Sequence, residues 1–112
     1  VGVFRYSSSN PNQLMFGAKN RPFSWDYLFP PDSSQFEIYN DSVLPLLNSY
    51  FDGYNATILA YGQTGSGKTY TMGTAGNYGT IASENQGIVP RVVDEIFASI
   101  KAKAKTTSFS IK

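Results

Sequence analysis

Residues 55–72 read Asn55-Ala56-Thr57-Ile58-Leu59-Ala60-Tyr61-Gly62-Gln63-Thr64-Gly65-Ser66-Gly67-Lys68-Thr69-Tyr70-Thr71-Met72, and this stretch decides the fold. Its central part, from Gly62 to Thr69, fits the phosphate-binding loop pattern G-x-x-x-x-G-K-[ST]. The short, apolar and β-branched segment 56–61 before the loop predicts a buried strand, and a helix is expected to begin at Lys68. The order strand, loop, helix is the one in which such a loop binds phosphate.

Each residue type in the loop has a chemical role. Glycines permit positive φ values, so that successive backbone N–H groups converge on an anion. Lys68 is expected to contact the β- and γ-phosphates, and no carboxylate borders it in the sequence, so its charge awaits a phosphate. The Thr69 hydroxyl is expected to bind Mg²⁺. The apolar segment argues against a merely flexible Gly/Ser turn, so we predict a nucleotide site formed by Gly62, Gln63, Thr64, Gly65, Ser66, Gly67, Lys68 and Thr69.

The composition indicates a folded chain with few kinds of reactive group. The 112 residues are 41% hydrophobic and 15% aromatic, which predicts a core rather than a disordered tail. The absence of Cys and His excludes disulfides, thiolate or imidazole metal sites and histidine catalysis. A net charge of +1 gives no reason to expect a polyanionic partner. Neither a membrane span nor a signal peptide is evident, and we expect a cytosolic protein.

The first thirty residues predict short strands. Residues 1–6 alternate loosely and predict a strand, and residues 13–16 predict a second short strand. Turn-forming residues follow these segments at 7–12 and 17–20. In the next run every second residue is aromatic, so that four rings would share one face of a strand: Phe23, Trp25, Tyr27 and Phe29. Such a face could stack on RNA bases or form a core beneath a helix. Since no K/R-G-F/Y-G/A-F signature accompanies it, the core is favoured and no nucleic-acid binding is predicted.

A helix is expected after Pro30-Pro31. Ser34 and Glu37 form a capping box at its start. Apolar residues then recur at spacings of three and four, which predicts an amphipathic helix with the buried residues Phe36, Tyr39, Val43, Leu46 and Tyr50. Pro45 should kink this helix, and Gly53 should end it.

The last part of the chain predicts a loop, a helix and a strand. The glycines that follow Met72 indicate a loop over residues 73–86. Helix should resume near Val89, with Pro90 in its first turn and with an apolar face of Val93, Ile96, Phe97 and Ile100. Residues 108–111 alternate and predict a strand. The order strand, helix, strand, loop, helix is an α/β pattern with a parallel sheet.

Three segments resemble the kinesin motor domain in the family's order and spacing. Residues 53–74 resemble its phosphate-loop segment, and Phe23-Ser24-Trp25-Asp26-Tyr27-Leu28-Phe29 resembles its F-x-F-D-x-V-F strand. Gly87-Ile88-Val89-Pro90-Arg91 resembles its G-I-I-P-R segment, and residues 44–47 and 89–92 lean toward kinesin-4-type motors. The resemblance implies a P-loop NTPase with a mostly parallel central sheet flanked by helices. It also implies a motor that couples MgATP hydrolysis to movement along microtubules in the cytoplasm and cytoskeleton.

The resemblance further implies roles for single residues. Tyr70 would pack against adenine, although it could instead be a core aromatic. The family's γ-phosphate sensors, N-x-x-S-S-R-S-H and D-L-A-G-S-E, are absent, and its R-x-R-P adenine clamp is absent because Tyr6 follows Arg5. We therefore assign no catalytic residue and expect residues 1–112 to be the N-terminal part of a motor domain, ending before the switch regions and inactive alone.

Some alternatives stay open at this point. The resemblance implies that the principal microtubule contacts lie outside these residues. Lys101, Lys103 and Lys105 could form a microtubule or nucleic-acid patch, but three lysines make only a small patch, so a solvated helix end is favoured. Another P-loop NTPase, such as a helicase or GTPase, is one rival class. A non-catalytic pseudo-motor that binds filaments is the other.

Overall fold

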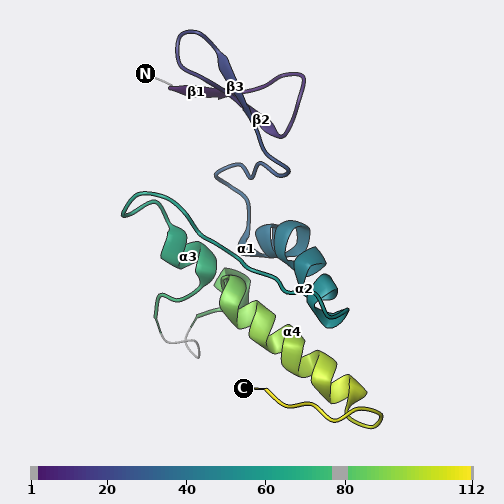
Figure 1. Cartoon of the computed structure of the whole chain (residues 1–112). Helices are drawn as coiled ribbons and strands as arrows, with labels where there is room; N and C mark the ends of the chain where they lie inside the picture. Colours follow the sequence, from purple (N-terminus) through teal and green to yellow (C-terminus); the bar gives the residue numbers. More distant parts are fainter. Residues whose placement is uncertain (1–2, 77–80, 112) are drawn as a thin grey trace. The chain divides into compact units, whose positions relative to one another are not determined.

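The computed structural model describes residues 3–76 and 81–111, which divide into two units (Figure 1). The first unit, Val1–Ser33, contains the strands β1 (Phe4–Tyr6), β2 (Gln13–Phe16) and β3 (Arg21–Ser24). The second unit, Ser34–Lys112, contains α1 (Gln35–Ile38), the π-helical turn η1 (Tyr39–Val43), α2 (Leu44–Phe51), α3 (Lys68–Met72), the 3-10 turn η2 (Ser83–Asn85) and α4 (Ile88–Lys103).

The first unit is an antiparallel sheet in the order β1-β2-β3. The predicted strand over residues 13–16 is confirmed, as is the turn after it, where the Asn20 N–H donates to the Gly17 carbonyl oxygen at 3.1 Å. The predicted first strand is confirmed for Phe4–Tyr6, while residues 1–2 lie outside the described residues.

The prediction that four alternating rings share one strand face was wrong. β3 ends at Ser24 because its partner β2 begins at Gln13, which is the residue opposite Ser24. The rings associate in pairs: Phe23, within β3, stacks on Trp25 with ring centroids 6.3 Å apart, and Tyr27 stacks on Phe29 at 6.1 Å.

The second unit begins with the predicted capping box. The Ser34 hydroxyl accepts from the Glu37 N–H at 3.1 Å, and the Glu37 carboxylate accepts from the Ser34 N–H at 2.6 Å. Two satisfied N–H groups fix the point at which α1 starts.

Pro45 is accommodated by a change of helix type. The five residues of η1 form a π-helical turn, in which the Leu44 N–H donates to the Tyr39 carbonyl oxygen. Pro45 thereby falls in the first turn of α2. N–H groups in the first turn make no hydrogen bond within the helix, so a proline there costs none. The expected helix is thus divided into α1, η1 and α2. It ends at Phe51 with Asp52 as the C-cap, and Gly53 follows in the left-handed region that we predicted.

The buried side of this helical segment is not the predicted one. Tyr39 and Val43 are buried as expected, but Phe36, Leu46 and Tyr50 are 57%, 41% and 49% exposed. The buried positions are instead spaced by four residues: Gln35, Tyr39, Val43 and Leu47. In a regular α-helix that spacing drifts around the axis, and the wider π turn offsets the drift.

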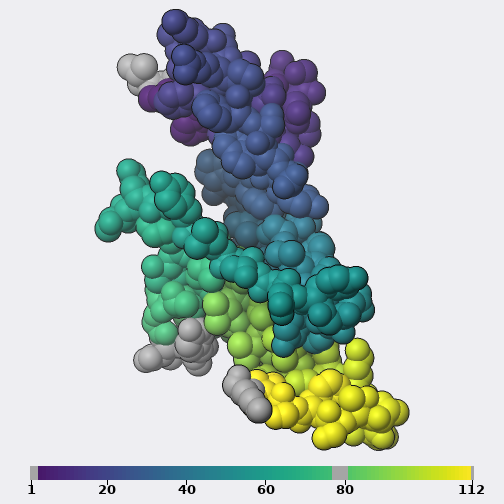
Figure 2. Space-filling model, in the orientation of Figure 1, coloured from purple at the N-terminus to yellow at the C-terminus, as the bar shows by residue number. Residues whose placement is uncertain are grey.

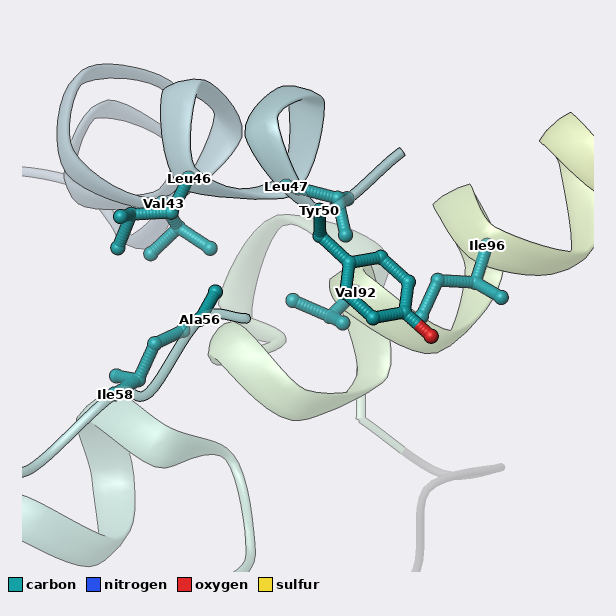
Figure 3. Close-up of a pocket in the computed structure, with 8 residues that line it drawn as sticks. All are labelled: Val43, Leu46, Leu47, Tyr50, Ala56, Ile58, Val92 and Ile96. Carbon is teal, nitrogen blue, oxygen red and sulfur yellow. The ribbon is translucent and has the colours of Figure 1, made fainter. Parts of the chain in front are cut away.

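The core of the second unit is small. Tyr39, Val43 and Ile88 are buried together, and four half-buried residues pack against them: Leu44, Ile58, Met72 and Val92. An apolar pocket of about 350 Å³ lies beside this core, between α2, the segment after it and α4 (Figure 3). Its lining residues are Val43, Leu46, Leu47, Tyr50, Ala56, Ile58, Val92 and Ile96.

Segment 56–61 does not pair as the predicted strand. It runs without helix or strand between α2 and α3 (Figure 1). Ile58 reaches the core, but Leu59 and Tyr61 are 85% and 96% exposed. The physical reason is that a strand needs a neighbour, and all strands among the described residues belong to the first unit.

Helix α4 begins one residue before Val89 and carries Pro90 in its first turn, as predicted. Its apolar face differs from the prediction, because Val93 and Phe97 are 44% and 58% exposed while Ile88 is buried. The predicted strand over residues 108–111 was also wrong, since these residues form no ladder. Among the helices of the described residues, none has the length and apolarity needed to cross a membrane.

Candidate nucleotide-binding site

The glycine-rich loop has the backbone geometry that the sequence predicts. Gly65 and Gly67 have φ values of +79° and +99°, in the left-handed region where a Cβ would be strained. The loop closes with a hydrogen bond of 3.1 Å from the Ser66 N–H to the Gln63 carbonyl oxygen. Gly67 is the N-cap of α3, so the helix begins at Lys68 as predicted. The loop lies at the surface of its unit, in teal-green in Figure 2.

Lys68 folds back over the loop that precedes it. Its ammonium group donates to the carbonyl oxygens of Gly62 and Gln63 at 2.6 and 2.7 Å. The expectation that the charge of Lys68 has no partner within the protein was therefore wrong. That expectation considered carboxylate side chains, whereas both partners are backbone carbonyl oxygens. Two of the three ammonium hydrogens are used in this way, and the group is fixed above the loop.

Thr69 and Tyr70 follow on the first turns of α3, and both are exposed. The Tyr70 side chain is 60% exposed, so within the described residues it is not a core aromatic. Both residues line a pocket of about 230 Å³ together with Gly73, Ala75, Ile81, Asn85, Gln86, Gly87 and Pro90. The side chains expected to meet Mg²⁺ and adenine are thus accessible to a ligand.

The predicted interruption after Met72 is confirmed. α3 ends at Met72, and its C-cap Gly73 lies against Gly87, the N-cap of α4. A Cβ on Gly73 would lie 2.8 Å from the Gly87 Cα, so the two backbones approach as closely as glycines allow. Part of the predicted loop, residues 77–80, lies outside the described residues.

Arg91 fastens the second half of this loop to α4. Its guanidinium donates to the carbonyl oxygens of Gln86 and Ser83, both at 2.9 Å, and to that of Glu84 at 3.2 Å. The same group lies 5.8 Å from the centre of the Phe36 ring. This role could not be predicted from the sequence, although Arg91 is the last residue of the G-I-V-P-R segment that resembles the family pattern.

Gln35 is a second residue that the sequence analysis missed. It is only 5% exposed, and its amide donates to the Tyr70 carbonyl oxygen at 2.7 Å. The available signal was weak: a long amide directly after the helix cap, at a position on the buried side of α1.

Two ionisable groups near these elements have shifted pKa values. The backbone N–H and the hydroxyl of Ser34 hold the pKa of Glu37 below its usual value. Burial raises the pKa of Tyr39, the nearby Glu95 raises it further, and Arg91 opposes the shift. Neither group belongs to the loop, so we assign neither of them to ligand chemistry.

The residues of the loop fit a nucleotide with bound magnesium. Two glycines in the left-handed region shape a cradle that a Cβ would strain, one lysine is fixed above it, and the Thr69 hydroxyl is exposed beside it. The described residues contain no cluster of three acidic or other metal-ligating side chains. The Thr69 hydroxyl is the side chain of this loop that would contact a magnesium ion, beside the oxygen atoms of the nucleotide.

This geometry and the G-x-x-x-x-G-K-T sequence of residues 62–69 fit the phosphate-binding loop of the P-loop NTPase class. The sequence profile of the kinesin motor domain matches residues 5–112. The chain therefore belongs to the kinesin motor domain family. It is 46% identical over 98% of its length to Kinesin-related protein 8 of Dictyostelium discoideum, and 48% identical over 82% of its length to human chromosome-associated kinesin KIF4A. It spans 6% and 7% of these two proteins.

Solved structures agree with the sequence comparison. The chain is similar to the Drosophila kinesin family member NOD bound to manganese and ADP, with a TM-score of 0.84, 36% identity and 95% of the chain covered. A NOD structure with AMPPNP gives the same TM-score at 34% identity. The chain spans 36% of the length of each NOD chain. The predicted fold class, a P-loop NTPase of the kinesin type, is thereby confirmed.

Proposed function

We propose that residues 1–112 are the N-terminal part of a motor domain that couples MgATP hydrolysis to movement along microtubules. The observation that carries this proposal is the position of Lys68, whose ammonium is held by two loop carbonyls directly before α3. A cation held at the loop can form charge-assisted hydrogen bonds to a phosphate and neutralise its charge. The NOD structures with ADP and with AMPPNP support a nucleotide as the ligand.

Each residue of the site is proposed to bind a different part of the nucleotide. The loop from Gly62 to Gly67 cradles the phosphates through its N–H groups, and Lys68 neutralises their charge. The Thr69 hydroxyl contacts Mg²⁺, and the exposed ring of Tyr70 packs on adenine. Phosphoryl transfer depends mainly on such positioning and charge neutralisation, and bound Mg²⁺ adds further neutralisation of the phosphate oxygens. No residue of this chain is assigned as the group that positions the attacking water.

The partners follow from the family. A NOD structure was docked with tubulin into a map of the NOD–microtubule complex, which supports microtubules as the filament. We place the protein in the cytoplasm on the microtubule cytoskeleton, with no direct nucleic-acid partner. Its similarity to KIF4A supports the kinesin-4 type that the sequence suggested.

The test is ATP turnover by the full-length protein with and without microtubules. A motor should hydrolyse ATP slowly alone and several-fold faster on microtubules. A pseudo-motor would bind microtubules without such stimulation. That result would refute the proposed motor function and would not contradict the proposed nucleotide binding.

A further inference from the structure

Helix α3 is too short to be stable by itself. It contains five residues, none of them buried, and helices of this length depend on tertiary contacts. Its hydrogen bonds include those from the Thr71 N–H to Gly67 at 2.9 Å and from the Gly73 N–H to Thr69 at 2.9 Å. The residues that would meet the nucleotide lie at its beginning, so their positions depend on what holds its end.

Three contacts hold α3 from its middle residue, Tyr70, to its C-cap, Gly73. Met72 packs against the core cluster, and Gly73 lies against Gly87. The third contact is polar: the Gln35 amide donates to the Tyr70 carbonyl oxygen at 2.7 Å, across 35 positions of sequence. Gln35 is the buried polar side chain of the described residues, and its helix is fixed in turn by the capping box of Ser34 and Glu37.

We propose that Gln35 is a positioning residue of the nucleotide site. It holds the backbone of Tyr70 and so keeps α3 in the orientation in which Lys68, Thr69 and Tyr70 meet the ligand. This inference rests on the proposed nucleotide-binding function. The Tyr70 oxygen also accepts from the Gly73 N–H at 3.1 Å, so loss of Gln35 leaves no bare carbonyl and the fold should persist.

The test compares variants of Gln35 that keep its size. Gln35→Met removes the donor, and Gln35→Glu replaces the donor with a charge that repels the carbonyl oxygen. We expect the KM for ATP of the full-length protein to rise about three- to ten-fold in Gln35→Met, and further in Gln35→Glu, while kcat at saturating ATP changes little. Lowering the pH from about 8 to 6 should restore part of the affinity of Gln35→Glu, because a buried carboxyl is readily protonated and then donates again.

The matched control is Gln13→Met. Gln13 donates to the Ser24 hydroxyl at 2.9 Å in the sheet of the first unit, so the same exchange removes one exposed side-chain hydrogen bond from another element. It should leave the KM for ATP unchanged.

Two results would overturn the inference. One is an unchanged KM in Gln35→Met, and the other is a loss of thermal stability in that variant with unchanged ATP affinity, which would make Gln35 a packing residue. If Gln35→Glu fails to fold, Gln35→Met decides alone. If the wild-type protein does not bind ATP, the proposed nucleotide-binding function is refuted. If the wild type binds ATP and Gln35→Met binds it equally well, only the proposed role of Gln35 is refuted.

Discussion

Replacing Gly87 with alanine should destabilise the junction between α3 and α4. The φ value of Gly87 is −81°, which alanine adopts without strain, so the effect isolates the steric contact. The nearest atom to the new Cβ would be the backbone nitrogen of Gly73, followed by the Gly73 Cα at 2.5 Å and the Thr71 carbonyl oxygen at 2.6 Å. Real Cβ contacts essentially never fall below 3.0 Å, so the backbones must separate by more than 0.5 Å, the difference between 3.0 and 2.5 Å at the Gly73 Cα.

The magnitude follows from the nature of the contact. Overpacking a filled site typically costs about 1–3 kcal/mol, and here the obstructing atoms belong to the backbone and cannot rotate away. We expect a loss of about 2–3 kcal/mol in the free energy of unfolding, at the upper end of that range. Because α3 carries Lys68 and Thr69, its displacement should also raise the KM for ATP several-fold.

The assay is urea unfolding of the full-length protein, with steady-state ATPase measured in parallel. Gly53→Ala is a suitable control: its φ is +96° and its Cβ would meet nothing within 4 Å. It should lose about 1–2 kcal/mol through backbone strain alone and keep the wild-type KM. The steric reasoning would be refuted by a Gly87→Ala variant within about 0.5 kcal/mol of wild type, the range of an ordinary surface substitution.

Three further predictions concern separate parts of the second unit. Tyr70→Ala should weaken ATP and GTP binding alike by about one to two decades, because stacking tolerates any base, and should barely change the melting temperature; the reverse pattern would place the ring in the core. Leu47→Ala should lower the free energy of unfolding by about 2–4 kcal/mol and Leu46→Ala by clearly less, because Leu47 is 5% exposed and Leu46 is 41% exposed; equal losses in denaturant unfolding would contradict the observed burial. Glu37→Gln should make folding stability depend less on pH in acid, as measured by circular dichroism. The lowered pKa of Glu37 stabilises the fold above the unfolded-state value of about 4.5, and this stabilisation is lost as pH falls through the folded-state value. The same loss of stability with falling pH in wild type and variant would count against the shift.

Local signals were sufficient where the structure depends on neighbouring residues. The capping box of Ser34 and Glu37, the turn before β3 and the start of α3 at Lys68 all follow from contacts within a few residues. The loop pattern likewise placed the expected nucleotide ligands on one segment. These features need no knowledge of the remaining chain.

Longer-range features could not be predicted in the same way. The π turn at Tyr39–Val43 changes which side of the helix is buried, and spacings of three and four assume a regular α-helix. Segment 56–61 has a strand-like composition, but pairing depends on a neighbouring strand that composition cannot supply. Gln35 and Arg91 donate hydrogen bonds to backbone carbonyl oxygens. Because every residue carries such an oxygen, no pattern of side chains in the sequence predicts these contacts.

The central claim is that the loop before α3 binds the phosphates of ATP through Lys68. The most direct measurement is calorimetric titration of the full-length protein with MgATP, comparing wild type, Lys68→Ala and the control Lys101→Ala at the exposed end of α4. Loss of a charge-assisted hydrogen bond should weaken binding by about ten- to a hundred-fold in Lys68→Ala, while Lys101→Ala binds as wild type does. Equal ATP affinity in wild type and a folded Lys68→Ala variant would contradict the assignment of the phosphate loop.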